Sequence, residues 1–178
     1  PMFVACHQFN YLEKSDVLKV VAPGGTFLLN SPYGPDDVWG HLPAHVQRHI
    51  IEKRLRFFVI DAYRVAHESG LGGRINTIMQ TGFFAISGII PKDEAIAAIK
   101  HFIEKSYSKR GEAIVQKNFN AVDQALAHLF EVTVPAQVTS TIELRQPVLA
   151  EAPEFVQKVT ARLIAGQGHE LPVGALPV

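Results

Sequence analysis

Short apolar runs mark the amino-terminal third of the chain. Mostly apolar residues fill positions 3–6, 26–29 and 55–60, and turn residues border the second and third of these runs. Continuous apolar runs of this length are typical of parallel strands that helices cover on both faces. The pattern therefore predicts three buried strands.

Segments with apolar residues at helical spacing separate and follow these runs. They lie at residues 11–18, 38–51, 75–90, 91–105 and 114–129. The start of the second segment has two interpretations. Asp36 or Asp37 could cap one continuous helix, or Pro43 could separate an early turn from a helix that begins near it.

The order of strand, helix, strand, helix, strand and then helices predicts an α/β fold. We expect a Rossmann-like parallel sheet flanked by helices. Three strands are few for a free-standing sheet of this type, and the chain opens directly on an apolar run. We therefore expect the sheet to be incomplete at the N-terminus and the chain to be a piece of a longer polypeptide.

The pattern changes from Val132 onward. Prolines crowd this part of the chain, at positions 135, 147, 153, 172 and 177. They leave room for one short helix between Pro153 and Gly166, with Phe155, Val156, Val159 and Leu163 expected to face inward. We therefore expect an α/β domain at residues 1–131 and, at residues 132–178, an extended Pro-rich strap with one short helix.

The amino-acid composition bears on which partners and cofactors the chain could bind. The 17 basic and 17 acidic residues balance, which does not favour a nucleic-acid partner. No segment is long and apolar enough to suggest a membrane span. Cys6 is the single cysteine, which excludes an internal disulfide framework and a cysteine-ligated cluster held within this chain. A reducing, cytoplasmic location fits these features best.

Two loops are candidates for ligand contact. The glycine-rich stretch at residues 70–73 lets the backbone approach a ligand closely, and Arg74 and Asn76 follow it near the start of a predicted helix. The stretch lacks the full dinucleotide fingerprint, so an ordinary loop before an amphipathic helix is the alternative. Asn30 and Ser31 follow the second strand, at the sheet edge where open α/β sheets place ligands.

Histidine and cysteine offer weaker candidates. His41, His45 and His49 recur every four residues and could share one helix face as zinc ligands. No nearby Glu or Cys completes such a site, so a solvated helix face is the better interpretation. Cys6 and His7 are neighbours on a predicted strand, where consecutive side chains point to opposite faces. Cys6 is therefore expected to be a small core residue, and we assign no catalytic residue and no metal ligand.

Several stretches together resemble one enzyme family. They read FVACHQF (3–9), APGGTFLLNSPY (22–33), RINTIMQT (74–81), FFAISG (83–88) and APEFVQ (152–157). With further matches within 111–123, they resemble the pyruvate:ferredoxin (flavodoxin) oxidoreductase family over nearly the whole chain. The segment is similar to the gamma-type central domain of that enzyme and its strap toward the next domain.

The resemblance implies a 2-oxoacid:ferredoxin oxidoreductase that converts pyruvate and coenzyme A to acetyl-CoA and carbon dioxide. Thiamine diphosphate and 4Fe–4S clusters would belong to other domains of the same polypeptide, and ferredoxin or flavodoxin would accept the electrons. The family's enzymes are cytoplasmic homodimers, some of which supply electrons to nitrogen fixation.

Within such an enzyme this segment would bind no cofactor of its own. It would close over the active site and help to position coenzyme A, with Asn30, Ser31, Arg74 and Asn76 at the ligand edge, and it would be inactive alone. The alternative is a scaffold domain that only assembles the thiamine- and cluster-binding domains.

The chain also departs from the family pattern. It lacks the earlier strand and glycine-rich turn thought to approach coenzyme A, and it contains no thiamine diphosphate motif or cysteine cluster. Gly82 stands where cysteine is expected, and Ser108 stands where glycine is usual.

Overall fold

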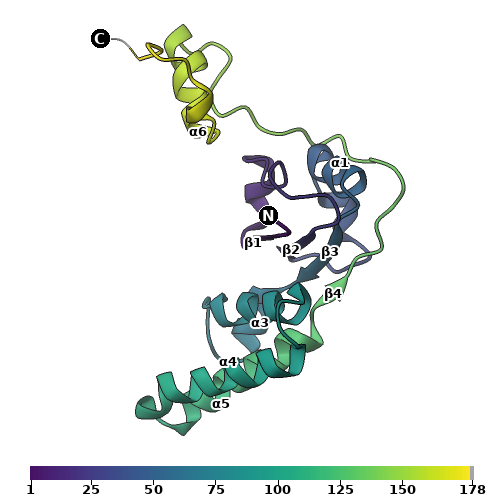
Figure 1. The fold of residues 1–178 in the computed structure, drawn as a ribbon, viewed down its shortest axis with the longest axis vertical. Helices are drawn as coiled ribbons and strands as arrows, with labels where there is room; N and C mark the ends of the chain where they lie inside the picture. The colour runs from purple at the N-terminus through teal and green to yellow at the C-terminus, as the bar shows by residue number, and fades with distance from the viewer. Residues whose placement is uncertain (177–178) are drawn as a thin grey trace.

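A sheet of four strands organises the first 131 residues (Figure 1). The computed structural model describes residues 1–176. The strands follow one another across the sheet in chain order: β1 (Phe3–Cys6), β2 (Thr26–Asn30), β3 (Arg56–Ile60) and β4 (Phe130–Glu131). The first three are parallel, and β4 pairs antiparallel with β3. The predicted α/β fold is confirmed, with β4 as a strand that the sequence pattern did not reveal.

Side chains of the central strands alternate between two apolar cores. Phe27 and Phe57 point to one side, where their rings stack with centroids 5.3 Å apart. Leu28 and Phe58 point to the other side. All five residues of β2 are buried, as expected of a central parallel strand that is covered on both faces.

Helices cover both faces of the sheet, and an additional helix lies outside them (Figure 1). The first face carries the 3₁₀ turns η1 (Phe9–Glu13) and η2 (Val38–His41) and the helix α1 (Ala44–Glu52). The second face carries α2 (Ala62–Glu68), α3 (Asn76–Ser87) and α5 (Glu112–Ala127). The outer helix α4 (Lys92–Tyr107) packs on α3 and α5, and the 3₁₀ turn η3 (Ser108–Arg110) connects α4 to α5.

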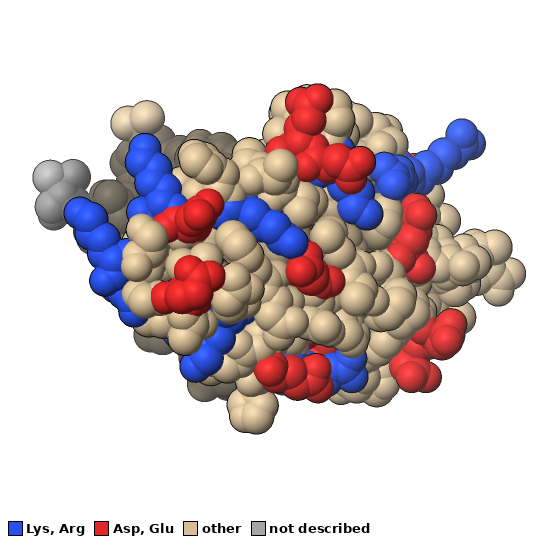
Figure 2. Space-filling view, turned by 90° about the horizontal axis from the view of Figure 1, so that it is seen from below, with Lys and Arg blue, Asp and Glu red and all other residues tan. Residues whose placement is uncertain are grey.

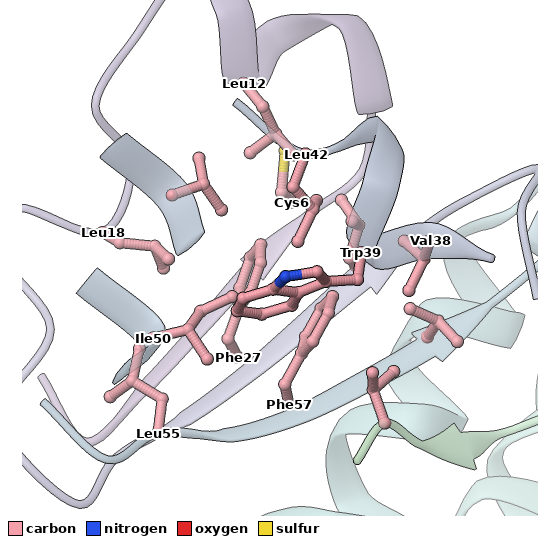
Figure 3. Close-up of a cluster of buried hydrophobic side chains, with 14 of the residues drawn as sticks. Cys6, Leu12, Leu18, Phe27, Val38, Trp39, Leu42, Ile50, Leu55 and Phe57 are labelled. Carbon is pink, nitrogen blue, oxygen red and sulfur yellow. The ribbon is translucent and has the colours of Figure 1, made fainter. Parts of the chain in front are cut away.

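The first core is built around Trp39 (Figure 3). The indole of Trp39 lies beside the stacked rings of Phe27 and Phe57, and the thiol of Cys6 points into the same cluster. Cys6 is 5% exposed, which confirms the prediction that it is a small core residue. Within residues 1–176, no helix combines the length and apolar character that crossing a bilayer requires.

The helix predicted at residues 11–18 is wrong. The chain forms the short η1 there and continues as turns. Leu12 and Leu18 are fully buried in the first core. The Nζ of Lys53 donates hydrogen bonds to three backbone carbonyls in residues 18–21, at 2.7–3.0 Å. Since a side chain from beyond α1 binds these carbonyls, tertiary packing overrides the helical spacing of the sequence.

Of the two interpretations of the second helical segment, the separate early turn is correct. Pro43 lies between η2 and α1 and occupies the N-cap position of α1. Asp37 precedes η2, but its side chain makes no capping hydrogen bond. The fixed φ of proline and its missing N–H are tolerated at this junction because no helical hydrogen bond is lost there.

The helical layers on the second face differ in detail from the sequence prediction. The helix predicted over 75–90 ends at Ser87, because Gly88 adopts a left-handed φ of 69° that closes the last turn. In α4 the expected inner stripe is confirmed at Ile99 and Ile103, which are buried. It is wrong at Phe102, whose side chain is 65% exposed.

Residues 132–153 run as an extended strap past α1 toward a small helical segment at the carboxyl end, which begins at Glu154 (Figure 1). That segment contains the π-helical turn η4 (Val156–Thr160), α6 (Ala161–Ile164) and the 3₁₀ turn η5 (Gly168–Glu170). The predicted short helix is therefore present. The expected inward row is confirmed at Val159, which is 5% exposed, and Val156 is partly buried. It is wrong at Phe155 and Leu163, which are 44% and 52% exposed. The division at residue 131 stays a prediction.

Candidate functional site

An open pocket of about 370 Å³ lies where the carboxyl ends of β1, β2 and β3 meet. It is lined by Gln8, Phe9, Asn10, Asn30, Pro32, Tyr33, Asp61 and Tyr63. Ligands of open α/β sheets bind outside the carboxyl ends of the strands. The edge that the sequence indicated at Asn30 therefore has a pocket of suitable position and size.

Asn30 forms part of the pocket wall and joins three segments of the chain. Its Nδ2 donates to the carbonyl of His7 at 2.9 Å, and its Oδ1 accepts from the backbone N–H of Ala62 at 2.9 Å. The residue is only 3% exposed. One N–H and one oxygen lone pair of the carboxamide remain for other partners. Asn30 thus holds the ends of β1 and β3 in place at the pocket.

Ser31 shapes the loop that follows β2. Its Oγ donates to the carbonyl of Tyr33 at 2.9 Å and lies 3.0 Å from the backbone N–H of the same residue. Its own backbone N–H donates to the carbonyl of Ile60 at 2.9 Å. Ser31 is buried, so its contribution to the site is the position of Tyr33.

Aromatic rings form one side of the pocket and continue behind it. The ring of Tyr33 meets Phe9 edge to face at 5.2 Å between centroids. On its other side Tyr33 stacks on His41, with centroids 3.6 Å apart and planes within 4°. Tyr63, in the first turn of α2, also lines the pocket and is half exposed. Such surfaces favour a flat, partly apolar ligand group.

Asp61 is the charged side chain among the residues that line the pocket. It caps α2, and its Oδ1 accepts a hydrogen bond from the backbone N–H of Arg64 at 3.1 Å. Arg64 pairs with Glu68 along the helix, at 3.8 Å. Because a carboxylate faces the pocket, an anionic group would be repelled from its interior and would have to lie at the rim.

Arg74 and Asn76 lie apart from this pocket, and neither lines it. Arg74 is exposed, and its Nε donates to the carbonyl of Leu71 at 3.1 Å. Asn76 is exposed at the first position of α3. The structure therefore brings Asn30 and Ser31 together at the sheet edge and leaves Arg74 and Asn76 as a second pair at the start of α3.

The glycine-rich stretch connects two helices. Gly70 and Gly72 have left-handed φ values of 74° and 63°, which side chains other than glycine rarely adopt. They turn the chain from α2 into α3, while Leu71 between them is buried. This geometry matches the ordinary-loop alternative and explains the glycines without a ligand.

The three histidines do not form the solvated helix face that the sequence favoured. His41 is exposed but stacks on Tyr33, and His49 Nε2 lies 3.1 Å from Asp16 Oδ2. His45 is partly buried, and both of its ring nitrogens are without a hydrogen-bond partner among the described residues. Burial lowers the pKa of His45, while the nearby Asp16 carboxylate acts in the opposite direction.

The described residues do not fit an iron–sulfur cluster. Such a cluster takes four cysteine thiolates, whereas this chain has one cysteine. The Sγ of Cys6 donates to the carbonyl of Gln8 at 3.2 Å, and burial raises the pKa of this thiol. Across residues 1–176 no group of three His, Cys, Asp or Glu side chains is placed to hold a metal ion.

Sequence reasoning missed Gln8, Phe9 and Tyr63. A usable signal was present, because Gln8 and Phe9 follow β1 as Asn30 follows β2, and Tyr63 follows β3. The positional rule for parallel sheets applies equally to all three strand ends.

The sheet order and the helices on both faces define an α/β domain of the open-sheet class, with a candidate pocket at the strand ends. Similarity to known proteins then narrows this class. A family model described as pyruvate ferredoxin/flavodoxin oxidoreductase matches residues 1–128, and the chain belongs to this family. A second model, described as a domain of unknown function, matches residues 141–178. The resemblance noted from the sequence motifs is confirmed.

Curated relatives match almost the whole chain. It is 52% identical over 176 residues to a pyruvate-flavodoxin oxidoreductase of Rhodospirillum rubrum, covering 99% of this chain and 15% of that protein. It is 49% identical to a putative pyruvate-flavodoxin oxidoreductase of Synechocystis, covering 98% and 15%. A pyruvate:ferredoxin oxidoreductase of Moorella thermoacetica is 45% identical, covering 96% and 14%. The chain thus spans about 15% of the length of these relatives.

One solved structure shares the fold. The pyruvate oxidoreductase subunit PORC of Thermotoga maritima superposes with a TM-score of 0.57, covering 73% of this chain and 64% of that subunit. The two sequences are 20% identical, so this likeness bears on the fold alone.

Proposed function

We propose that this chain works as the α/β domain of a longer pyruvate:ferredoxin or pyruvate:flavodoxin oxidoreductase. The observation that carries the proposal is the 52% identity to such an enzyme over 99% of the chain. That enzyme would oxidise pyruvate and join its acetyl group to coenzyme A. It would release carbon dioxide and pass two electrons, one at a time, to ferredoxin or flavodoxin. A homodimer in the cytoplasm is part of the same proposal.

The chemical steps belong to other parts of the polypeptide in this proposal. Thiamine diphosphate would supply the carbanion chemistry and 4Fe–4S clusters the electron path, and both groups would be held by other domains of the polypeptide. In this proposal, the chain forms one side of the active site. Its pocket at the sheet edge is rigid because Asn30 and Ser31 bind the strand ends to one another. The domain would therefore act by closing the site, excluding water and helping to position coenzyme A.

Two features support a role in positioning coenzyme A. The pocket presents the rings of Tyr33 and Tyr63 and the exposed amides of Gln8 and Asn10, which suit a flat, polar ring such as adenine. Arg74 is exposed, and its two terminal nitrogens make no hydrogen bond or ion pair within residues 1–176. A guanidinium of this kind suits a phosphate group.

The test measures the dependence of pyruvate oxidation on coenzyme A in the intact enzyme. Arg74→Ala should raise the apparent KM for coenzyme A about tenfold and leave kcat near the wild-type value, because a ground-state contact is removed. Arg48→Ala is the matched control, since Arg48 is exposed on α1, across the sheet from Arg74. Unchanged KM values in both variants would leave Arg74 without a role in binding.

The second candidate is a scaffold that assembles the thiamine- and cluster-binding domains without touching coenzyme A. It is favoured by the internal hydrogen bonds of Asn30 and Ser31 and by the carboxylate of Asp61 in the pocket. Tyr63→Ala separates the two candidates, because Tyr63 is half exposed and lines the pocket. Normal KM and kcat in both Tyr63→Ala and Arg74→Ala would support the scaffold.

A further inference from the structure

The strap is fastened to the side of α1 by buried hydrogen bonds. Gln47 is fully buried, and its Oε1 accepts from the backbone N–H groups of Thr139 and Ser140 at 2.9 and 3.0 Å. The backbone N–H of Ala44 donates to the carbonyl of Ile142 at 2.8 Å. Arg145 follows, with an ion pair of 2.7 Å to Glu13. These contacts therefore attach the strap to the sheet domain as far as residue 145.

Beyond residue 145 the attachment is weaker. The segment 146–176, here named the terminal module, reaches back to the sheet domain through an ion pair of 3.4 Å between Lys19 and Glu170. Both of these side chains are largely exposed, so water and salt screen the pair. The terminal module is thus a separate small unit at the end of a fastened strap, as Figure 1 shows.

The terminal module presents an apolar row on its helix. Phe155, Val159 and Leu163 are spaced four residues apart and lie along one side. Val159 is covered, but its neighbours in the row are 44% and 52% exposed. Charged residues occupy the adjacent row, where Glu154 pairs with Lys158 and Arg162 follows.

Further large apolar side chains of the terminal module are exposed. They are Leu149, Ile164, Val173 and Leu176. Single exposed apolar residues are common on protein surfaces, so an interaction surface is indicated by Phe155 and Leu163, which share one side of the helix. The helix has too few residues to fold on its own around Val159 alone, which adds to the need for a partner surface.

The length of the relatives indicates which partner covers the exposed apolar side chains of the terminal module. The terminal module lies inside the match to relatives of which this chain spans about 15%, and it has its own family model. The greater part of those polypeptides lies outside this chain, so a partner surface in the same polypeptide is present at high effective concentration.

We propose that the exposed side chains of Phe155 and Leu163, one turn before and one turn after the buried Val159, dock into an apolar groove on another domain of the same longer polypeptide, with the strap setting their position. This inference rests on the proposed function, because it takes the chain to be one domain of such a polypeptide. The attached strap positions the terminal module. Docking of the module would then fix the position of the sheet domain relative to the neighbouring domain.

The test uses the longer polypeptide that carries this chain, under native conditions and with mild proteolysis. Leu163→Ser removes an exposed member of the row. Arg162→Ser is the matched control, because it makes a similar change in helix propensity one residue away and outside the row. Leu163→Ser should speed cleavage of the strap at least about fivefold, and Arg162→Ser should change it less than about twofold. Equal cleavage of the two variants overturns the proposal.

A second measurement needs no variant. Hydroxyl-radical labelling of the native wild-type polypeptide should oxidise Phe155 and Leu163 at least about fivefold more slowly than labelling after denaturation. Equal rates overturn the docking, and so does protection that rises with protein concentration, since it identifies a second copy as the occupant. Neither readout depends on turnover. Pyruvate-dependent ferredoxin reduction by the same wild-type preparation tests the proposed function separately.

Discussion

The Oδ1 of Asn30 accepts a hydrogen bond from the backbone N–H of Ala62 at 2.9 Å, which joins the end of β2 to the start of α2. The Nδ2 of the same carboxamide donates to the carbonyl of His7 beyond β1. One side chain thus fixes the relative positions of three chain segments that form the candidate pocket. Its geometry matters for stability as well as for ligand contact.

Replacing Asn30 should therefore destabilise the domain. Asn30→Ala leaves the carbonyl of His7 and the N–H of Ala62 without their partner, at a cost of about 2–4 kcal/mol. Denaturant titration followed by the fluorescence of Trp39, the single tryptophan, measures this loss. Asn10→Ala is the control, because Asn10 also lines the pocket but is exposed, and it should change stability by less than about 0.5 kcal/mol. Equal stability of the two variants would mean that the tether contributes nothing.

Gln47 should control whether the strap stays attached. Its Nε2 donates to the carbonyl of Trp39 at 2.6 Å, while its Oε1 binds two backbone N–H groups of the strap. Gln47→Leu keeps the approximate size of the side chain but leaves the carbonyl of Trp39 and both backbone N–H groups of the strap without this partner. Cleavage within residues 132–145 by a low concentration of protease should become about tenfold faster.

The control for this experiment is Gln116→Leu. Gln116 is an exposed glutamine on α5 whose side chain bonds only to the exposed Glu112 among the described residues. Its replacement should leave the cleavage rate of the strap unchanged. If Gln47→Leu is cleaved no faster than Gln116→Leu, the strap is held by its other contacts.

The parallel strands were predictable because each is a continuous apolar run, and burial on both faces demands such runs. Strand β4 was not, since a strand of two residues has no period and exists only through its pairing with Val59 and Phe58. The false helix at residues 11–18 fails for a related reason, because Lys53, far along the chain, binds the carbonyls of Leu18 and of the two residues 19 and 21 that follow it. Local spacing carries no information about such partners.

The candidate site was predictable in position but not in role. The place of Asn30 and Ser31 follows from the rule that strand ends face ligands. Their hydrogen bonds depend on His7 and Ala62, which lie 23 and 32 residues from Asn30 in the sequence. The separation of Arg74 from this pocket likewise depends on how α2 and α3 pack, which no motif in the glycine-rich stretch encodes.

His45 should make the stability of the domain depend on pH. Its imidazole is partly buried with both ring nitrogens unpaired, and burial lowers its pKa below the ordinary value of 6.5. The folded state then binds a proton less readily than the unfolded state. The contribution of His45 to the free energy of unfolding should be greatest above the unfolded-state pKa. It should be lost as the pH falls from the unfolded-state pKa through the lower folded-state pKa.

Denaturant titrations at pH 7.5 and pH 5.5, about one unit on either side of the ordinary pKa, test this dependence. The wild-type chain should be less stable at the lower pH. In His45→Phe the replaced ring keeps an aromatic side chain but cannot take up a proton, so the loss on acidification should shrink. His49 Nε2 and Asp16 Oδ2, which lie 3.1 Å apart, are unchanged in this variant, so the comparison isolates His45. An equal loss in both proteins would assign the dependence to groups other than His45.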